Sequence, residues 1–252
     1  MSLKVPGKYH RLAPFEGLFQ SGVPILMYHK IGRRPPRVRL KGLYVSPERF
    51  AGQLRELKEA GFATTGLEGV RAPAPAGGRQ KALALTFDDG YRNVFENATG
   101  PMAEQGFHGI QFLVTNFLGG VNEWDTRVGE TAERLMDEVQ VREWMGAGHE
   151  IGSHSLSHPR LTRLSVRDAR EEIVASRKKL EDLFGRRIRH FCYPYGDWNE
   201  AVRELVVEAG YETASSIRFG VNTPETSPYV LCRIMVRHPT RSLRALRARL
   251  FR

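Results

Sequence analysis

The sequence predicts an α/β protein whose parallel strands form a closed or distorted barrel of about seven to eight strands. Short apolar segments alternate with amphipathic segments along most of the chain. Such alternation needs crossover connections, which are right-handed and make neighbouring strands parallel. About eight strand-like and about seven helix-like segments within 252 residues favour a barrel over an open sheet.

The first strand and the first long helix have clear sequence signals. Residues 23–28 form a short, apolar and partly β-prone run that stops at His29, which predicts a buried strand. Ser46 supplies an N-cap and Pro47 suits the first helical position, so a helix is expected from Pro47 until Gly61 ends it.

The remaining elements continue the same rhythm. Residues 71–80 are rich in Pro, Ala and Gly and predict a surface connection within one domain, because the alternation continues beyond them. Further strands are expected over residues 62–64, 81–87, 109–114, 149–153, 191–193, 211–215 and 231–236. Further helices are expected over residues 93–105, about 131–147, a long segment capped by Ser165, 199–209 and 241–251.

Length and composition predict a polar N-terminal arm over residues 1–22 followed by one barrel domain over residues 23–252. Apolar residues make up 41% of the chain, and no run approaches the roughly 18 apolar residues of a membrane span. Two cysteines cannot build a disulfide framework, and no secretory leader is visible. The sequence as given therefore predicts a cytoplasmic protein, or an exported one if a leader was removed.

The net charge of +10 is concentrated in two basic stretches, residues 33–41 and 237–252. One interpretation is an anionic partner such as nucleic acid, a membrane surface or an acidic glycan. A second interpretation is an amphipathic helix with a solvated face. It is favoured because Leu243, Leu246 and Leu250 repeat at helical spacing with arginines between them. No nucleic-acid-binding module accompanies the charge, so no nucleic-acid partner is expected.

Asp88 and Asp89 follow an expected strand and precede Gly90, which can allow a sharp turn. Adjacent carboxylates repel, but a cation that neutralises one of them leaves the other free to exchange protons. A solvated turn is the alternative. It is disfavoured because the residues that lead into the turn, including Leu83 and Leu85, are apolar.

His154 and His158 are four residues apart, so both imidazoles can face one point from a single turn. Two histidines and one carboxylate would hold a zinc-type ion and leave a position open for water, as a hydrolytic metal requires. Two surface histidines near a helix start remain the alternative for this segment.

Residues 190–196 form an apolar strand that runs into Pro194 and Gly196. Main-chain N–H groups in such a turn can bind a developing oxyanion, but for this segment alone a plain strand-to-helix turn with packed aromatic side chains is the favoured interpretation. Tyr195, like His29, His154 and the paired carboxylates, lies at or just beyond the C-terminal end of a strand. In a parallel barrel these ends share the face on which active sites are built.

Together, these segments resemble the polysaccharide deacetylases of the NodB-homology group, carbohydrate esterase family 4, from about residue 23 to 250. Residues 86–90 are similar to the first family motif, which implies that Asp88 is the general base and Asp89 a metal ligand. Residues 154–158 are similar to the second motif, which implies that both of its histidines bind the metal. Residues 191–196 are similar to the third, which implies that the Tyr195 N–H helps form an oxyanion hole.

The chain departs from the family pattern in two places. The third motif often has an Arg that contacts the base, and Cys192 stands there, which makes Arg233 a candidate for that contact alongside a structural ion-pair role. The late motif that usually supplies the acid is not evident. Instead, residues 26–29 resemble the circularly permuted branch, which includes poly-N-acetylglucosamine deacetylases and in which an N-terminal histidine, here His29, is the acid. His238 is the competing candidate.

The resemblance implies a NodB-like distorted (β/α) barrel that removes acetyl groups from an N-acetylated glycan with a divalent ion, zinc by expectation. In that mechanism Asp88 takes a proton from water and His29 protonates the departing amine. Trp124, Tyr91 and Trp198 could stack on sugar rings or could be buried packing. Two alternatives remain: an amidohydrolase acting on a small non-sugar amide, and an inactive carbohydrate-binding relative.

Overall fold

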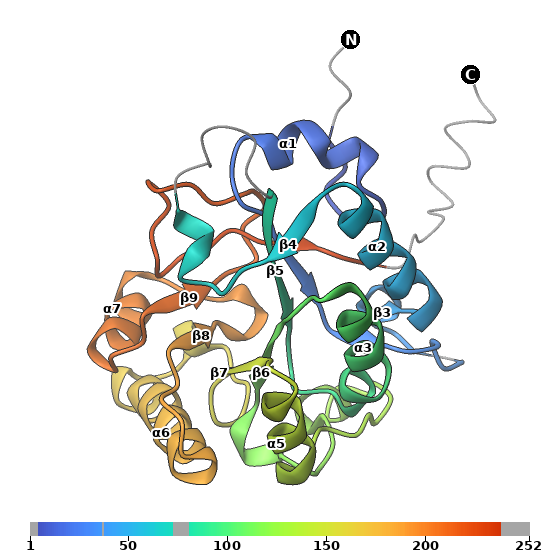
Figure 1. Cartoon of the computed structure of the whole chain (residues 1–252). Coiled ribbons are helices and arrows are strands. Elements are labelled where there is room, and N and C mark those ends of the chain that lie inside the picture. The colour runs from blue at the N-terminus through green and yellow to red at the C-terminus, as the bar shows by residue number, and fades with distance from the viewer. Residues whose placement is uncertain (1–4, 37, 73–80, 238–252) are drawn as a thin grey trace, which may run out of the picture.

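Eight strands form one curled parallel sheet in the computed structural model, which describes residues 5–36, 38–72 and 81–237 (Figure 1). The strands are β1 (Ile25–Tyr28), β4 (Phe62–Thr64), β5 (Lys81–Phe87), β6 (Ile110–Leu113), β7 (Glu150–Ser153), β8 (His190–Cys192), β9 (Thr213–Ser215) and β10 (Ile234–Met235). Their order is β10-β1-β5-β6-β7-β8-β9, and β4 pairs with the first half of β5. Every pairing is parallel, as the alternation of elements predicted.

Backbone hydrogen bonds continue from β9 to β1 through the segment that contains β10. The Leu231 N–H donates to the Ala214 carbonyl at 2.9 Å, and Leu231 forms a parallel bridge with Ser215. Further along the same segment, the Val236 N–H donates to the Met27 carbonyl at 2.9 Å. The two ends of the sheet are therefore linked, which gives the distorted barrel that the sequence predicted.

The larger helices surround the strands (Figure 1). The α-helices are α1 (Glu16–Gln20), α2 (Pro47–Glu59), α3 (Arg92–Gln105), α4 (Glu123–Thr126), α5 (Glu138–Gly146), α6 (Val166–Phe184) and α7 (Glu200–Glu208). Short 3₁₀ turns span Ala13–Phe15, Lys41–Leu43, Gly69–Arg71, Thr115–Phe117, Leu161–Arg163 and Pro194–Gly196, and β2 (Lys30–Ile31) pairs with β3 (Tyr44–Val45). None of the helices in the described ranges is both long and apolar enough to cross a membrane.

The start of α2 lies where its cap predicted it, and α3 ends at Gln105 as expected. The Ser46 side chain accepts a hydrogen bond from the Arg49 N–H, so α2 begins at Pro47. Gly106 adopts a left-handed conformation, φ 66°, and ends α3.

The expected helix over residues 131–147 is wrong at its start. Leu135 forms an antiparallel bridge with Tyr91, and the Met136 N–H donates to the Gly90 carbonyl at 2.8 Å, so this stretch is extended beside the strand ends. Asp137 and Gln140 then form a capping box, and α5 begins at Glu138. The backbone contacts with Gly90 and Tyr91 keep residues 135 and 136 extended, and the capping box starts the helix only at Glu138, although the spacing of apolar residues before it is helical.

Part of the expected arm over residues 1–22 is packed into the hydrophobic core. Tyr9, Phe15 and Phe19 are buried, and their rings lie within 6.1 Å of one another. The Tyr9 N–H donates to the Met235 carbonyl at 3.0 Å, so this segment adds to the edge of β10. The helix expected over residues 241–251, the candidate acid His238 and most of the surface connection at 71–80 lie outside the described residues.

Candidate active site

The residues singled out from the sequence converge at the C-terminal end of the barrel. His29 follows β1, Asp88 and Asp89 follow β5, and His154 follows β7. Asp88, Asp89, His154 and His158 are all buried, and the His29 side chain is 15% exposed. Segments separated by more than a hundred residues thus contribute to one centre, as the parallel topology requires.

Asp89, His154 and His158 form a cluster with the geometry of a metal site. Asp89 Oδ1 lies 3.4 Å from Nε2 of His154 and 3.4 Å from Nε2 of His158. Ligands held about 2.1 Å from a tetrahedral ion are separated by about 3.4 Å, so one ion could contact all three atoms. The donor set therefore fits a divalent ion such as zinc.

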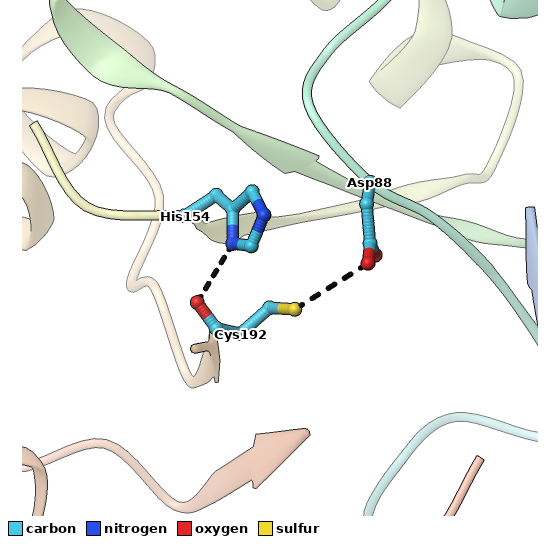
Figure 2. Close-up of side chains that lie close together, drawn as sticks. All are labelled: Asp88, His154 and Cys192. Carbon is cyan, nitrogen blue, oxygen red and sulfur yellow. Dashed lines mark hydrogen bonds between the residues drawn. The ribbon is translucent and has the colours of Figure 1, made fainter. Parts of the chain in front are cut away.

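A main-chain contact orients His154 toward this cluster. Its Nδ1 lies 2.7 Å from the Cys192 carbonyl oxygen, which can only accept a hydrogen bond (Figure 2). Nδ1 must therefore carry the proton, and in the neutral ring the Nε2 lone pair faces Asp89. This is the arrangement by which a carbonyl fixes the tautomer of a metal-ligating histidine.

Electrostatics keep Asp89 ionised but shift the two histidines in opposite directions. Burial alone would lower the pKa of His154, but Cys192 and Asp89 raise it well above its usual value. Burial alone would raise the pKa of Asp89, but contacts with His154 and His158 hold it well below its usual range. Burial also lowers the pKa of His158 despite the opposing effect of Asp89. A carboxylate and an uncharged imidazole are the forms that bind a cation.

The backbone is strained at this centre. The described residues include four non-glycine residues with positive φ: Asp89 at 77°, Ser155 at 67°, His158 at 63° and Tyr195 at 59°. Each is in, or next to, the segments that carry the predicted site residues. Left-handed backbone is unfavourable for these residue types, and its concentration at one place is typical of a functional site.

Asp88 is held by Arg233 and not by the histidine pair. Arg233 donates from NH1 to Oδ1 at 2.7 Å and from NH2 to Oδ2 at 2.9 Å, a bidentate ion pair in which both side chains are buried. The Arg233 Nε–H also donates to the Ser216 carbonyl at 2.7 Å. Burial would raise the pKa of Asp88, but Arg233 and His29 hold it below its usual value.

Cys192 occupies the space between Asp88 and His154 (Figure 2). Its Sγ lies 3.7 Å from Asp88 Oδ2 and 3.1 Å from Arg233 NH2. Arg233, which directly precedes β10, reaches Asp88 past this small side chain. Although Asp88, His154 and Cys192 are also close enough to share an ion, Arg233 already engages both carboxylate oxygens of Asp88.

His29 faces Asp88 from the other side. Its Nε2 lies 4.0 Å from Asp88 Oδ2. Burial lowers the pKa of His29, while the nearby Asp88 and Asp89 oppose that shift. The ring is therefore placed to exchange a proton at the same centre as Asp88.

Aromatic side chains surround His158. Its ring centroid lies 4.7 Å from that of Trp124 and 4.5 Å from that of Tyr195, which is 39% exposed. Tyr91 is fully buried and its hydroxyl donates to Asp125 at 3.2 Å, so it cannot stack on a sugar. Trp198 packs 6.2 Å from the Tyr193 ring. Tyr195 thus presents exposed aromatic surface beside the Asp89, His154 and His158 cluster.

A buried lysine next to the site was not anticipated from the sequence. Lys30 is fully buried, with Nζ 4.8 Å from the Tyr44 ring centre and 4.5 Å from that of Tyr91. Burial lowers its pKa, and Asp89 is the first of the charges that oppose this shift. Its position directly after His29 was the available signal, but a single Lys after a strand is too common to predict a role.

Comparison with known proteins identifies the family. A sequence profile described as "Polysaccharide deacetylase" matches residues 76–214, more than half of the chain. The chain belongs to the polysaccharide deacetylase family. This family assignment confirms the resemblance drawn from the motifs and makes the chain a relative of glycan-modifying hydrolases.

Similar proteins support the family assignment of this polysaccharide deacetylase. It is 22% identical over 227 residues to the poly-beta-1,6-N-acetyl-D-glucosamine N-deacetylase of Staphylococcus epidermidis, covering 84% of this chain and 78% of that protein. It is 34% identical over 124 residues to the peptidoglycan-N-acetylmuramic acid deacetylase PdaC of Bacillus subtilis, covering 49% of this chain but 23% of that protein. The structure of IcaB from Ammonifex degensii has the same fold, with a TM-score of 0.73, 21% identity and coverage of 86% of this chain and 92% of that one.

Proposed function

We propose that this polysaccharide deacetylase hydrolyses the N-acetyl groups of an N-acetylhexosamine-containing glycan with the help of a divalent ion, which we expect to be zinc. The observation that carries the proposal is the separation of two adjacent carboxylates: Asp89 faces two histidine Nε2 atoms, whereas Asp88 is paired with Arg233. One carboxylate is thereby available as a ligand and the other as a base. Residues 23–252 would act as one catalytic domain.

Asp89, His154 and His158 would hold the ion through one carboxylate oxygen and two Nε2 atoms. When bound, the ion supplies Lewis-acid chemistry: it polarises the acetyl carbonyl and lowers the pKa of water. Asp88 would accept the proton of the attacking water. Its low pKa keeps it ionised, and the bidentate Arg233 contact fixes its orientation.

His29 and Tyr195 would complete the reaction. The Tyr195 N–H lies in a turn with left-handed backbone, φ 59°, beside the metal cluster, and would donate to the oxyanion of the tetrahedral intermediate. His29 would then protonate the departing amine, so that acetate and a free amino sugar separate. Its proximity to Asp88 supports this role, because the base must reach the attacking water and the acid the departing nitrogen, and both are bonded to the same carbon in the tetrahedral intermediate.

The substrate class follows from the relatives. We include β-1,6-linked N-acetylglucosamine oligomers among the expected substrates, because the Staphylococcus epidermidis relative is named for that polymer. The exposed Tyr195 ring supports recognition of a sugar face at the mouth of the site.

The experiment measures acetate released by the zinc-loaded full chain from β-1,6-linked and β-1,4-linked N-acetylglucosamine oligomers and from small cyclic amides. We expect release from oligosaccharides and none from the cyclic amides. The His154→Ala/His158→Ala double variant should lose activity and should hold one equivalent of metal fewer than the wild type, because the Asp89 cluster is removed. Activity confined to the cyclic amides would indicate an amidohydrolase, and glycan binding without acetate release would indicate an inactive relative.

A further inference from the structure

A second cluster of ionisable side chains lies at the opposite end of the barrel from the candidate active site. Glu150 and His190 are the first residues of β7 and β8, and Glu68 precedes the 3₁₀ turn after β4. Since the strands are parallel, their N-terminal ends lie away from the face that carries Asp89 and His154. This cluster is therefore separate from the proposed catalytic centre.

The centre of the cluster is a fully buried histidine that faces two carboxylates. His190 Nε2 lies 3.4 Å from Glu150 Oε2 and 3.7 Å from Glu68 Oε2. Its Nδ1 is 2.9 Å from the Thr213 hydroxyl, which orients the ring. Within the described ranges, Nε2 has no hydrogen-bond partner although it is buried. A buried ring nitrogen that faces two carboxylates can be satisfied by a proton of its own or by a cation held between it and the carboxylates.

The spacing matches that of the first cluster. One atom from each of Glu68, Glu150 and His190 lies within 4.8 Å of the others. The separations of 3.4 and 3.7 Å are close to the 3.4 Å between Asp89 and its histidines. They are also close to the roughly 3.4 Å expected for ligands of one tetrahedral ion.

Arg189 already contacts both carboxylates and must be included in the charge balance. Its NH2 lies 3.0 Å from Glu150 Oε2 and 3.6 Å from Glu68 Oε2. Its NH1 lies 3.9 Å from Glu212, and the side chain is 34% exposed. The guanidinium can therefore keep Glu212 as a partner when another cation approaches Glu150. The net charge is −1 when His190 is neutral, counting Glu68, Glu150, Arg189 and His190.

Solvent reaches the carboxylates. The Glu68 side chain is 51% exposed, and a cavity of about 220 Å³ lined by Gly66, His108 and Glu150 reaches the second carboxylate. An ion could enter by this route and retain water as a fourth ligand, which a site with three protein ligands requires.

We infer that Glu68, Glu150 and His190 form a second, structural binding site for a divalent transition-metal ion such as zinc, one that connects the turn after β4 to the starts of β7 and β8. Imidazole and carboxylate ligands suit zinc and cobalt. Binding at this end of the barrel would stabilise the folded chain, because ligands held only in the native state shift the unfolding equilibrium.

The test uses the full chain carrying His154→Ala and His158→Ala, so that the catalytic cluster cannot bind metal. Cobalt(II) is titrated at pH 7.5, and the absorption of the tetrahedral ion is followed; zinc is then added in competition. We expect one equivalent to bind with a Kd of about 10 µM or tighter and zinc to raise the melting temperature. Adding Glu68→Gln should weaken binding by about tenfold or more.

Two further variants complete the design. Glu208→Gln removes an exposed carboxylate of α7 that pairs with Arg170 and not with Arg189, and should leave cobalt binding unchanged. His190→Gln should abolish binding; if that variant does not fold, Glu68→Gln decides, because Glu68 is half-exposed. Absence of cobalt binding in the double variant, or binding that Glu68→Gln leaves intact, would overturn the inference and leave a protonated His190 as the cation between the carboxylates.

Discussion

Asp88 and Asp89 are adjacent in sequence but contact different partners, and this separation underlies the proposed chemistry. Asp89 has left-handed backbone, φ 77°, which turns the chain directly after β5. Its carboxylate faces the histidine pair, whereas Asp88 faces Arg233. The strained turn thus lets two neighbouring residues serve as ligand and base without sharing one cation.

Replacing Asp88 with Asn is expected to retain bound metal and to reduce kcat by on the order of 10²-fold or more, because the general base is lost. Breaking its pair with Arg233 should also reduce the free energy of unfolding by up to about 3 kcal/mol. Metal content, acetate release and urea unfolding measure the three effects. Asp89→Asn is the matched control and should lose the metal of the Asp89, His154 and His158 cluster together with activity. Loss of metal in Asp88→Asn would show that the two roles are wrongly divided.

The proposed acid, His29, gives a pH prediction. Activity needs His29 protonated and Asp88 ionised, so kcat/KM should fall as pH rises through the pKa of His29 and as pH falls through that of Asp88. Burial lowers the pKa of His29, and the low pKa of Asp88 extends the acidic limb downward. His29→Ala should keep its metal and lose deacetylation, while His238→Ala stays near wild type. The opposite result for these two variants would move the acid to His238.

At the residue scale, sequence reasoning could identify the local motifs but could not settle their partners. The pairs at 88–89 and 154–158 are close in sequence, and the structure brings them to one centre. The contact between Asp88 and Arg233 spans 145 residues, so the sequence left Arg233 with two possible roles, and the geometry shows the bidentate pair. The Cys192 carbonyl that orients His154 carries no side-chain signal at all.

At the scale of the element, α5 shows where periodicity fails. Its expected start near residue 131 ignored Asp137 and Gln140, whose capping box marks the real start. The preceding residues are extended because their backbone bonds to Gly90 and Tyr91, a tertiary contact that helical spacing cannot reveal.

Asp137→Ala should therefore destabilise the protein, because the side chain accepts a hydrogen bond from the Gln140 N–H at 2.9 Å. We expect a loss of about 1 kcal/mol in the free energy of unfolding, measured by urea denaturation, with acetate release unchanged. Ser165→Ala, which removes the cap of α6, is a matched control and should have a similar effect. A change below about 0.3 kcal/mol for Asp137→Ala alone would show that the extended stretch, and not the cap, determines where α5 begins.

At the scale of the whole molecule, alternating elements predicted the parallel barrel, but not how it closes. Closure depends on one short segment, residues 231–236, that bonds to β9 at its start and to β1 at its end. The packing of Tyr9 and Phe15 against the barrel was also missed, because the polar residues between them conceal an apolar face. Both features depend on contacts between the ends of the chain, which local pattern does not encode.

Global stability should fall in mild acid because of His149. Burial, and then His108, lower the pKa of His149 from 6.5 to about 4. Between those values the unfolded chain binds a proton that the folded chain does not, so stability is full above pH 6.5 and decreases as pH falls toward 4. From pH 7.5 to pH 5 this histidine should account for a loss of about 2 kcal/mol.

The free energy of unfolding is measured in urea for the wild type and for His149→Gln, each at pH 7.5 and pH 5. Comparing the change with pH between the two proteins cancels the packing that the variant loses beside Trp144 at both pH values. The variant should show a pH dependence smaller by about 2 kcal/mol. His108→Gln is the control and should keep most of the wild-type dependence, because burial is the main cause of the shift. An unchanged pH dependence in His149→Gln would mean that the folded protein protonates His149 as readily as the unfolded chain does.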